Sequence, residues 1–225
     1  MKVLRSIFRF LIGITVGRKT AMYWLASNSE GKLLNFLDAG YLYENGWFRS
    51  LEENRSVNLR GEAIAWLPYS LLRFLNDRLQ PHLTILEYGA GASSFYFAAR
   101  VKAVVSVENN RSWYEHILAN KPQNLTLVLA ENEDTYVRAG GPVRKFDFIL
   151  VDGDFREACL RKGIEYLSDA GVILLDDTNA PEFNSLIPNM TQLGFKHLRF
   201  NDFAPIISYN KESTLFYRDG NCLGL

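Results

Sequence analysis

The segment at residues 84–94, TILEYGAGASS, joins an apolar run to a turn that contains two glycines. Its acid, Glu87, precedes Gly89 and Gly91, and Ser94 stands where the dinucleotide motif GxGxxG needs its third glycine. Glycine accepts backbone conformations that other residues avoid, and it lets a ligand lie against the bare peptide. A carboxylate repels a pyrophosphate at a helix start but can hold the cationic amino group of an amino acid. The segment therefore favours a ligand with an amino-acid group over a dinucleotide.

A second acid, Glu108, follows the apolar run 103–107, about twenty residues after Glu87. A carboxylate at the end of the strand after a glycine turn can accept hydrogen bonds from both hydroxyls of a ribose. Either acid alone is more often a solvated residue at the edge of a sheet. In this order and at this spacing, together with the glycine turn, the two acids predict a nucleoside-binding site.

Two further groups of acids follow apolar runs, namely Asp152-Gly153-Asp154 and Asp176-Asp177. Carboxylates that meet at one place repel unless a cation or protons compensate, and oxygen ligands of this kind suit magnesium, calcium or manganese. Two interpretations stay open. In the first, Asp152, Asp176 and Asp177 bind a metal ion. In the second, Asp152 caps a helix, Asp176 and Asp177 shape a loop, and no metal binds.

These residues need a scaffold that brings the ends of several strands together. After Pro81 the sequence shows short apolar runs, each followed by a stretch with helical spacing, which is typical of a parallel sheet covered on both faces. We expect strands at 84–87, 103–107, 126–129, 146–151, 172–175, 195–200 and 213–217, and helices at 93–100, 112–120, 156–168 and 182–193, with a short turn at 134–138. Right-handed crossovers then make an α/β, Rossmann-like doubly wound sheet whose strand ends deliver the polar residues to one edge.

The first eighty residues carry apolar side chains at helical spacing, for example in the run 64–75. We therefore expect an N-terminal helical extension or cap at residues 1–80, followed by a single domain at 81–225. One predicted helix begins near residue 28 and runs towards residue 43, where two glycines weaken its end. A second covers about 69–79, because the proline before it suits the first turn of a helix.

The start of the chain places basic residues around the apolar run 10–16, which is too short to span a bilayer. Residues 1–18 are expected either to form a basic amphipathic helix on their own domain or to contact a membrane surface or a protein partner. Cys159 and Cys222 are too few for a disulfide framework and lack zinc-site spacing, which favours a cytoplasmic location. Because Lys plus Arg and Asp plus Glu each number 25, no overall field favours nucleic acid.

Several segments resemble the class I S-adenosylmethionine (SAM)-dependent methyltransferases. These are 86–91 (LEYGAG), 107–108 (VE), 146–153 (FDFILVDG), 193–195 (LGF) and 214–218 (TLFYR), so the resemblance covers about 83–218. It implies SAM as the cofactor and a last strand that enters the sheet antiparallel. It also implies that residues 81–225 form the SAM-binding domain.

The resemblance assigns roles to individual residues. Glu87 would hold the methionine amino group, Gly89 and Gly91 would pass under the cofactor, and Glu108 would bind the ribose. An acid after the third strand would contact adenine, for which Asp134 is chosen although Glu133 is equally suitable. The implied cofactor-binding set is Glu87, Tyr88, Gly89, Gly91, Ser93, Glu108, Asn109, Asp134 and Asp152.

The acids after the runs 146–151 and 172–175 also look like those of the metal-dependent catechol O-methyltransferase group. On that comparison Asp152, Asp176 and Asp177 would bind Mg²⁺ or Mn²⁺, and Asp152 would be the catalytic residue. Related macrolide and sugar methyltransferases often have a histidine just after the Asp-Gly-Asp triplet, and here Phe155 removes that candidate base. The chain also lacks the Asn/Asp-Pro-Pro-Tyr tetrapeptide that methylation of base amino groups would lead us to expect. The resemblance thus favours methylation at an oxygen of a small-molecule acceptor.

Other accounts stay open at this stage. Trp66 and Tyr69 would line the acceptor pocket or pack as core aromatics. An aminopropyltransferase-like enzyme would use a related sheet with a decarboxylated cofactor, and an inactive methyltransferase-like module would bind only a protein partner. The intact glycine turn and both cofactor acids favour the enzyme. A homo-oligomer is compatible with the sequence.

Overall fold

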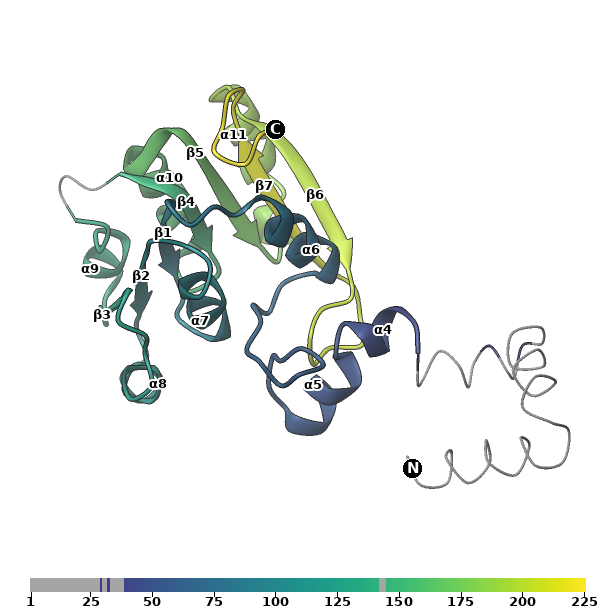
Figure 1. The fold of residues 1–225 in the computed structure, drawn as a ribbon. Coiled ribbons are helices and arrows are strands. Elements are labelled where there is room, and N and C mark those ends of the chain that lie inside the picture. Colours follow the sequence, from purple (N-terminus) through teal and green to yellow (C-terminus); the bar gives the residue numbers. More distant parts are fainter. Residues whose placement is uncertain (1–28, 30–31, 33–38, 142–144) are drawn as a thin grey trace, which may run out of the picture.

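The computed structural model describes residues 29, 32, 39–141 and 145–225, and its centre is a seven-stranded sheet (Figure 1). The strands are β1 (Thr84–Tyr88), β2 (Ala103–Glu108), β3 (Leu125–Leu129), β4 (Phe146–Val151), β5 (Leu167–Asp176), β6 (Lys196–Asp202) and β7 (Lys211–Tyr217). The helices are α4 (Tyr41–Glu44), α5 (Trp47–Glu53), α6 (Tyr69–Arg78), α7 (Ala92–Ala98), α8 (Arg111–Leu118), α9 (Glu133–Val137), α10 (Arg156–Tyr166), the 3₁₀ helix η1 (Pro181–Phe183) and α11 (Leu186–Gln192).

The strand order is β3-β2-β1-β4-β5-β7-β6. Strands β1 to β5 pair in parallel, whereas β7 enters between β5 and β6 and is antiparallel to both. The predicted α/β, Rossmann-like doubly wound sheet with an antiparallel last strand is therefore confirmed. The chain leaves β1 towards β2 and β3 and then returns to β4 on the other side of β1. Open sheets of this kind bind ligands at the carboxyl ends of the strands where the order reverses.

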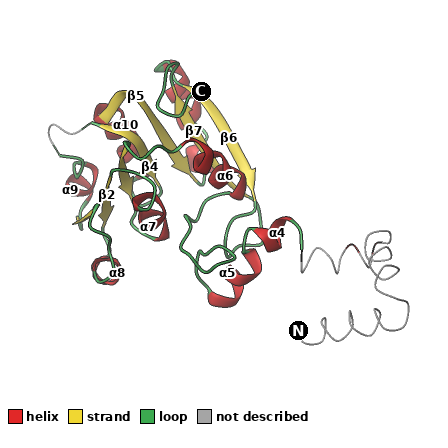
Figure 2. Ribbon diagram, in the orientation of Figure 1, coloured by secondary structure: helices red, strands yellow, loops and turns green. Residues whose placement is uncertain are grey.

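Helices cover both faces of the sheet (Figures 1 and 2). Alternate residues of β4 show why its sequence from Phe148 to Val151 is a continuous apolar run. Phe148 and Leu150 pack in one cluster with α6 and α7, and Ile149 and Val151 pack in the other with α10 and α11. A strand that is buried on both faces needs no polar alternation. The result is a rigid support for the strand ends.

Every predicted strand is present, and only β5 differs clearly in its bounds. It begins at Leu167, which pairs with Phe146 across an irregularity in the ladder, instead of at residue 172. The predicted helix 182–193 is wrong in its first part, where η1 and a break precede α11. Pro188 lies in the first turn of α11, and a proline ring would clash with the backbone of a helix continued upstream.

Residues 54–68 contain no helix, contrary to the prediction from the apolar spacing of 64–75. The backbone turns at Gly61, with a φ of 84°, and Val57 and Ala63 form an antiparallel bridge. Ile64 and Leu67 are nevertheless buried in the same cluster as α6 and β1, because they reach the core from a loop. In residues 54–68 the spacing of apolar residues therefore indicated which side chains are buried, but it did not indicate a helix.

The N-cap residues of α4 and α5 are Gly40 and Gly46, the two glycines expected to weaken a helix end. Most of the predicted helix at 28–43 and all of residues 1–18, with their expected membrane or partner contact, lie outside the described residues. Among the residues that are described, no helix is long and apolar enough to cross a membrane.

Candidate functional site

A cavity of about 940 Å³ opens at the carboxyl ends of β1, β2 and β4, where the strand order reverses. One wall is the glycine turn after β1, and another consists of residues that follow β2 and β4. The remaining walls come from the loops around residues 54–66 and 206–211. Ligand pockets typically measure about 300–1,000 Å³. The cavity therefore has room for a large ligand.

The glycine turn has one tight position and one open position. Gly89 has a φ of 99°, and a Cβ there would lie 2.8 Å from the backbone of Gly153, which follows β4. Gly91 has extended backbone, and the nearest atom to a Cβ there would be Ser93 Oγ at 3.9 Å. Gly89 is thus needed for the packing of two strand ends, whereas Gly91 leaves bare peptide beside open space in the cavity wall.

Glu87 is fully buried beneath this turn. Its Oε2 accepts hydrogen bonds from Ser94 Oγ and Ser106 Oγ, while its Oε1 has no partner among the described residues. Burial raises the pKa of Glu87 to about 7, although hydrogen bonds from Ser106, Ser93 and Ser94 act in the opposite direction. An unpartnered buried carboxyl oxygen is costly unless it meets a donor or takes up a proton. This orphaned oxygen fits a cationic group bound nearby.

The raised pKa makes stability depend on pH in a defined direction. The pKa of Glu87 is about 7 in the folded chain against 4.5 ordinarily, so the folded state holds the proton more tightly. The resulting stabilisation is complete below pH 4.5 and is lost as the pH rises to 7, with a change of about 3 kcal/mol. We expect Glu87→Gln to remove this loss, measured as the free energy of unfolding in urea between pH 4.5 and 8.

Glu165→Gln, on the exposed end of α10, is the control for this comparison because that carboxylate is not buried. Its pH profile should follow the wild type. If the profiles of Glu87→Gln and wild type run parallel over the whole range, Glu87 does not hold its proton as described.

Glu108, at the end of β2, lines the cavity and is only slightly exposed. Its Oε1 accepts from the backbone N–H groups of Asn109 at 3.0 Å and Asn110 at 2.7 Å, and its Oε2 accepts from Ala90 N at 3.3 Å. These bonds hold the carboxylate in one orientation, with lone pairs left for a ligand. Asn109 also lines the cavity and donates to Asp154.

The predicted cofactor-binding residues divide into two groups. Gly89, Gly91, Ser93, Glu108, Asn109 and Asp152 line the cavity. Glu87, Tyr88 and Asp134 do not. Tyr88 turns its ring into the core and donates to Val137 O at 2.9 Å, because successive residues of a strand face opposite sides. Asp134 is exposed and pairs with Arg138 at 2.7 Å, one turn along α9. The structure thus provides no side-chain contact with the cavity for these three.

Several aromatic residues of the cavity were not singled out from the sequence, among them Trp113 and Tyr136. Trp113 donates from Nε1 to Ala90 O at 2.7 Å, so its ring lies beside the glycine turn. Tyr136 of α9 reaches the wall near Gly153, where a Cβ would lie 2.1 Å from the tyrosine hydroxyl. No spacing rule identifies them, because each ring reaches the cavity from a helix that follows a different strand.

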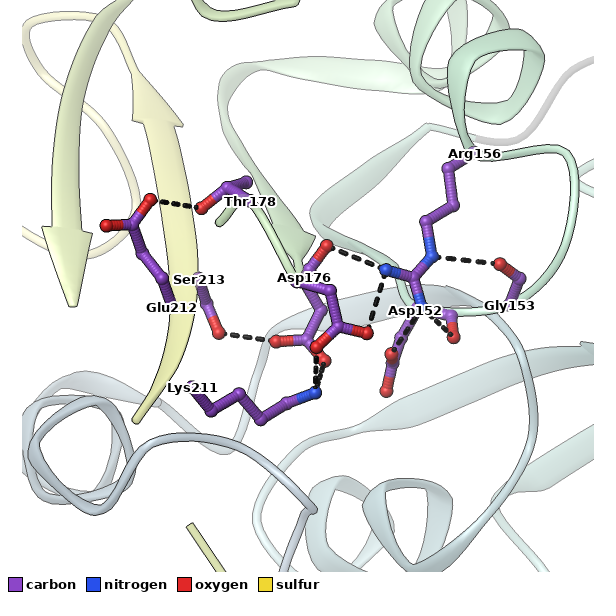
Figure 3. A network of polar contacts seen from close by, with 9 residues as sticks. Asp152, Gly153, Arg156, Asp176, Thr178, Lys211, Glu212 and Ser213 are labelled. Carbon is purple, nitrogen blue, oxygen red and sulfur yellow. Dashed lines mark hydrogen bonds and ion pairs between the residues drawn. The ribbon is translucent and has the colours of Figure 1, made fainter. Parts of the chain in front are cut away.

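Asp152, Asp176 and Asp177 do come together: one oxygen of each lies within 4.8 Å of the others. Two cationic side chains lie among them (Figure 3). Lys211 Nζ is 2.6 Å from Asp176 Oδ2 and also pairs with Asp177. Arg156 is 3.0 Å from Asp177 Oδ2 and 3.4 Å from Asp152 Oδ1. Asp176 is fully buried and accepts a further bond from Ser213 Oγ at 2.5 Å.

This donor set does not fit a resident metal ion. Three carboxylates facing two cations carry a net charge of −1, and a proton would neutralise it. Burial and the neighbouring Asp176 raise the pKa of Asp152 well above its ordinary value. Burial alone would raise the pKa of Asp177, but Lys211 and Arg156 hold it below its usual range. The expected Mg²⁺ or Mn²⁺ site is therefore not supported.

Trp66, Ile206 and Ile207 also line the cavity, together with polar residues such as Arg55 and Asn179. Tyr69, by contrast, is 2% exposed and packs in the core, so of the two aromatics considered from the sequence only Trp66 reaches the cavity. The cavity thus has a polar end at Asp152 and Lys211 and an apolar wall beside it.

No protein-family model and no curated protein matches the sequence. Solved structures do match. A methyltransferase from Pyrococcus furiosus shares the fold with a TM-score of 0.52 and 17% identity, over 80% of this chain and 95% of that one. A precorrin-6y C5,15-methyltransferase from Geobacter metallireducens has a TM-score of 0.49 and 16% identity over 65% of this chain and 85% of that one. A protein from Streptococcus mutans in complex with SAH has a TM-score of 0.49 and 10% identity over 68% and 99%.

Proposed function

We propose that this chain, which has the fold of the class I SAM-dependent methyltransferases, binds SAM in the cavity and transfers its methyl group to a small-molecule acceptor. One observation carries the proposal. At the point where the strand order reverses, bare peptide at Gly91 faces open space in the cavity that Glu108 lines, and the orphaned oxygen of Glu87 is buried beneath the same turn. That arrangement suits a nucleoside joined to an amino acid.

Different residues of the site would bind different parts of SAM. Glu108 would accept hydrogen bonds from the ribose hydroxyls, and the peptide at Gly91 would lie against the ligand. The buried carboxyl group of Glu87, with its unpartnered oxygen, would attract the amino group. SAM supplies an electrophilic methyl group on a sulfonium. The protein's task is then to position the acceptor and to take up its proton.

The polar end of the cavity suits an acceptor hydroxyl. Asp152 lines the cavity, and its deprotonated carboxylate can receive the proton of an acceptor hydroxyl. The apolar wall at Trp66, Ile206 and Ile207 would pack against the rest of the acceptor. We therefore propose oxygen methylation, with Asp152 as the catalytic base.

Calorimetric titration with SAM, with SAH and with decarboxylated SAM tests this proposal. We expect SAM and SAH to bind and the decarboxylated compound to bind more weakly. An inactive partner-binding module should bind none of them, and an aminopropyltransferase-like enzyme should prefer the decarboxylated compound. Either result would overturn the proposed function.

The ribose contact makes a separate prediction. Glu108→Gln should weaken SAM binding about tenfold to a hundredfold, because a hydrogen bond to a charged group contributes about 1.5–3 kcal/mol. The measurement is the Kd for SAM by calorimetry. Asp134→Asn is the matched control, since that carboxylate is exposed and paired with Arg138. Equal affinities for wild type and Glu108→Gln would remove the ribose assignment, and a loss in Asp134→Asn would support the adenine contact expected from the sequence.

A further inference from the structure

The acid cluster at the polar end of the cavity contains its own cation. We propose that the ammonium group of Lys211 takes the place that a divalent metal would hold among Asp152, Asp176 and Asp177, so that the site works without a metal ion. Its second part, that Lys211 helps to hold the acceptor, rests on the proposed function. The first part concerns only the residues of the cluster.

The sheet fixes the position of Lys211. It is the first residue of β7, and two residues later Ser213 pairs with Asp176 at the end of β5. Its side chain therefore starts beside the strand end that carries two of the three acids. Thr178 N also donates to Glu212 O at 3.0 Å, which ties the loop after β5 to the same strand. A lysine placed by paired strands is a built component of the site and not a mobile surface group (Figure 3).

The contacts of Lys211 are those of an enclosed ion pair. Its side chain is 10% exposed and that of Asp176 is 0% exposed, with 2.6 Å between Nζ and Oδ2. Ser213 Oγ donates to the other oxygen of Asp176, so the buried carboxylate has one hydrogen bond and one ion pair. The indole ring of Trp66 lies 5.7 Å from Nζ on the cavity wall. Solvent screening of this pair is accordingly weak.

The charges of the cluster are already nearly balanced. Arg156 holds Asp152 and Asp177, and Lys211 holds Asp176 and Asp177. A divalent ion would have to displace the Lys211 ammonium, because both would compete for the same carboxylate oxygens of Asp176 and Asp177. Removal of the Lys211 ammonium instead leaves three carboxylates with one cation, which is a set of oxygen ligands that suits Mn²⁺.

Lys211 also faces the acceptor. An ammonium has three N–H donors, and two are engaged by Asp176 and Asp177. No further hydrogen-bond partner of Nζ occurs among the described residues, and Lys211 lines the cavity beside Asp152. We assign the remaining donor to the oxygen of the acceptor, so that Lys211 orients the hydroxyl whose proton Asp152 receives.

Titration of the complete chain with Mn²⁺ alone tests whether Lys211 replaces a metal ion. Binding is measured by calorimetry and by the loss of the electron paramagnetic resonance signal of free Mn²⁺. The wild type and Lys211→Arg should show no binding at Mn²⁺ concentrations up to about 1 mM, which is on the order of the dissociation constants of the weakest specific cation sites. Lys211→Met, which keeps the aliphatic stem, should gain binding at least tenfold tighter than about 1 mM. Lys211→Met with Asp176→Asn should lose it again.

The folding of the variant is read at the same time. Mn²⁺ should raise the melting temperature of Lys211→Met and leave that of wild type unchanged, because an ion that binds only the folded state stabilises it. A variant that folds only with Mn²⁺ shows the same gain. Micromolar binding of Mn²⁺ by the wild type would overturn the proposal, and so would a folded Lys211→Met variant that binds no Mn²⁺. If Lys211→Met folds neither with nor without Mn²⁺, the titration of the wild type decides. SAM is absent from these titrations, so their failure leaves the proposed function standing.

Discussion

Replacing Gly91 with leucine should abolish the binding of SAM while the chain stays folded. Gly91 has extended backbone that any residue can adopt, and a Cβ there has no neighbour closer than 3.9 Å. A larger side chain would therefore enter the open part of the cavity without displacing protein atoms. Its bulk would occupy the space that the cofactor needs against the bare peptide. We expect the Kd for SAM to rise at least about a hundredfold, which corresponds to about 3 kcal/mol.

Calorimetry measures the Kd of Gly91→Leu for SAM, and unfolding in urea measures its stability. Because Gly91 is the N-cap of α7 and leucine is a poor cap, stability should fall by no more than about 1 kcal/mol. Gly91→Ala is the graded control and should weaken binding less. Unchanged SAM affinity in Gly91→Leu would place the cofactor elsewhere. A large loss of stability would instead show that the space beside Gly91 belongs to the packed protein.

Replacing Gly89 with alanine should have the opposite profile and destabilise the whole chain. Gly89 has a φ of 99°, and a Cβ would lie 2.8 Å from both Cα and N of Gly153. The neighbouring atoms are backbone of the loop after β4, which pairs with β1, so they cannot move aside as a side chain would. Positive φ costs about 1–3 kcal/mol and overpacking about 1–3 kcal/mol. We expect a loss of about 2–5 kcal/mol in the free energy of unfolding.

Urea unfolding followed by circular dichroism measures this loss, with Gly91→Ala as the matched control two residues away. The control should change stability by less than about 1 kcal/mol, since it meets no clash and has ordinary backbone. Equal stabilities of the two alanine variants would contradict the close approach of the turns after β1 and β4. If the prediction holds, one glycine of the motif serves the fold and the other serves the ligand.

Much of the scaffold followed from the sequence alone. Strands buried on both faces appear as short apolar runs, and the acids and glycines that end them are visible in order. Glu87, the glycine turn and Glu108 therefore predicted a nucleoside site at one edge of the sheet, and Gly91 and Glu108 do line a common cavity. The antiparallel last strand followed only from the resemblance to methyltransferases, because no local pattern distinguishes its direction.

The interior of the site depended on the tertiary structure. Glu87 was expected to face its ligand, but its burial beneath Ser94 follows from the packing of α7 against β1 and β2. Residues 54–68 carry apolar side chains at helical spacing and yet form a loop, because a buried side chain needs contact with the core and not a particular backbone. Spacing along the chain cannot separate these cases.

The acid cluster shows the difference most clearly. Its carboxylates could be listed from the sequence, since each follows a strand, and a metal was a reasonable counter-ion for them. The actual counter-ions are Lys211 and Arg156, two of 25 basic residues in the chain. Local sequence determines where strands end, because burial and turn chemistry act over a few residues. Only the insertion of β7 beside β5 decides which cation meets Asp176, because η1, α11 and β6 lie between the two residues in the sequence.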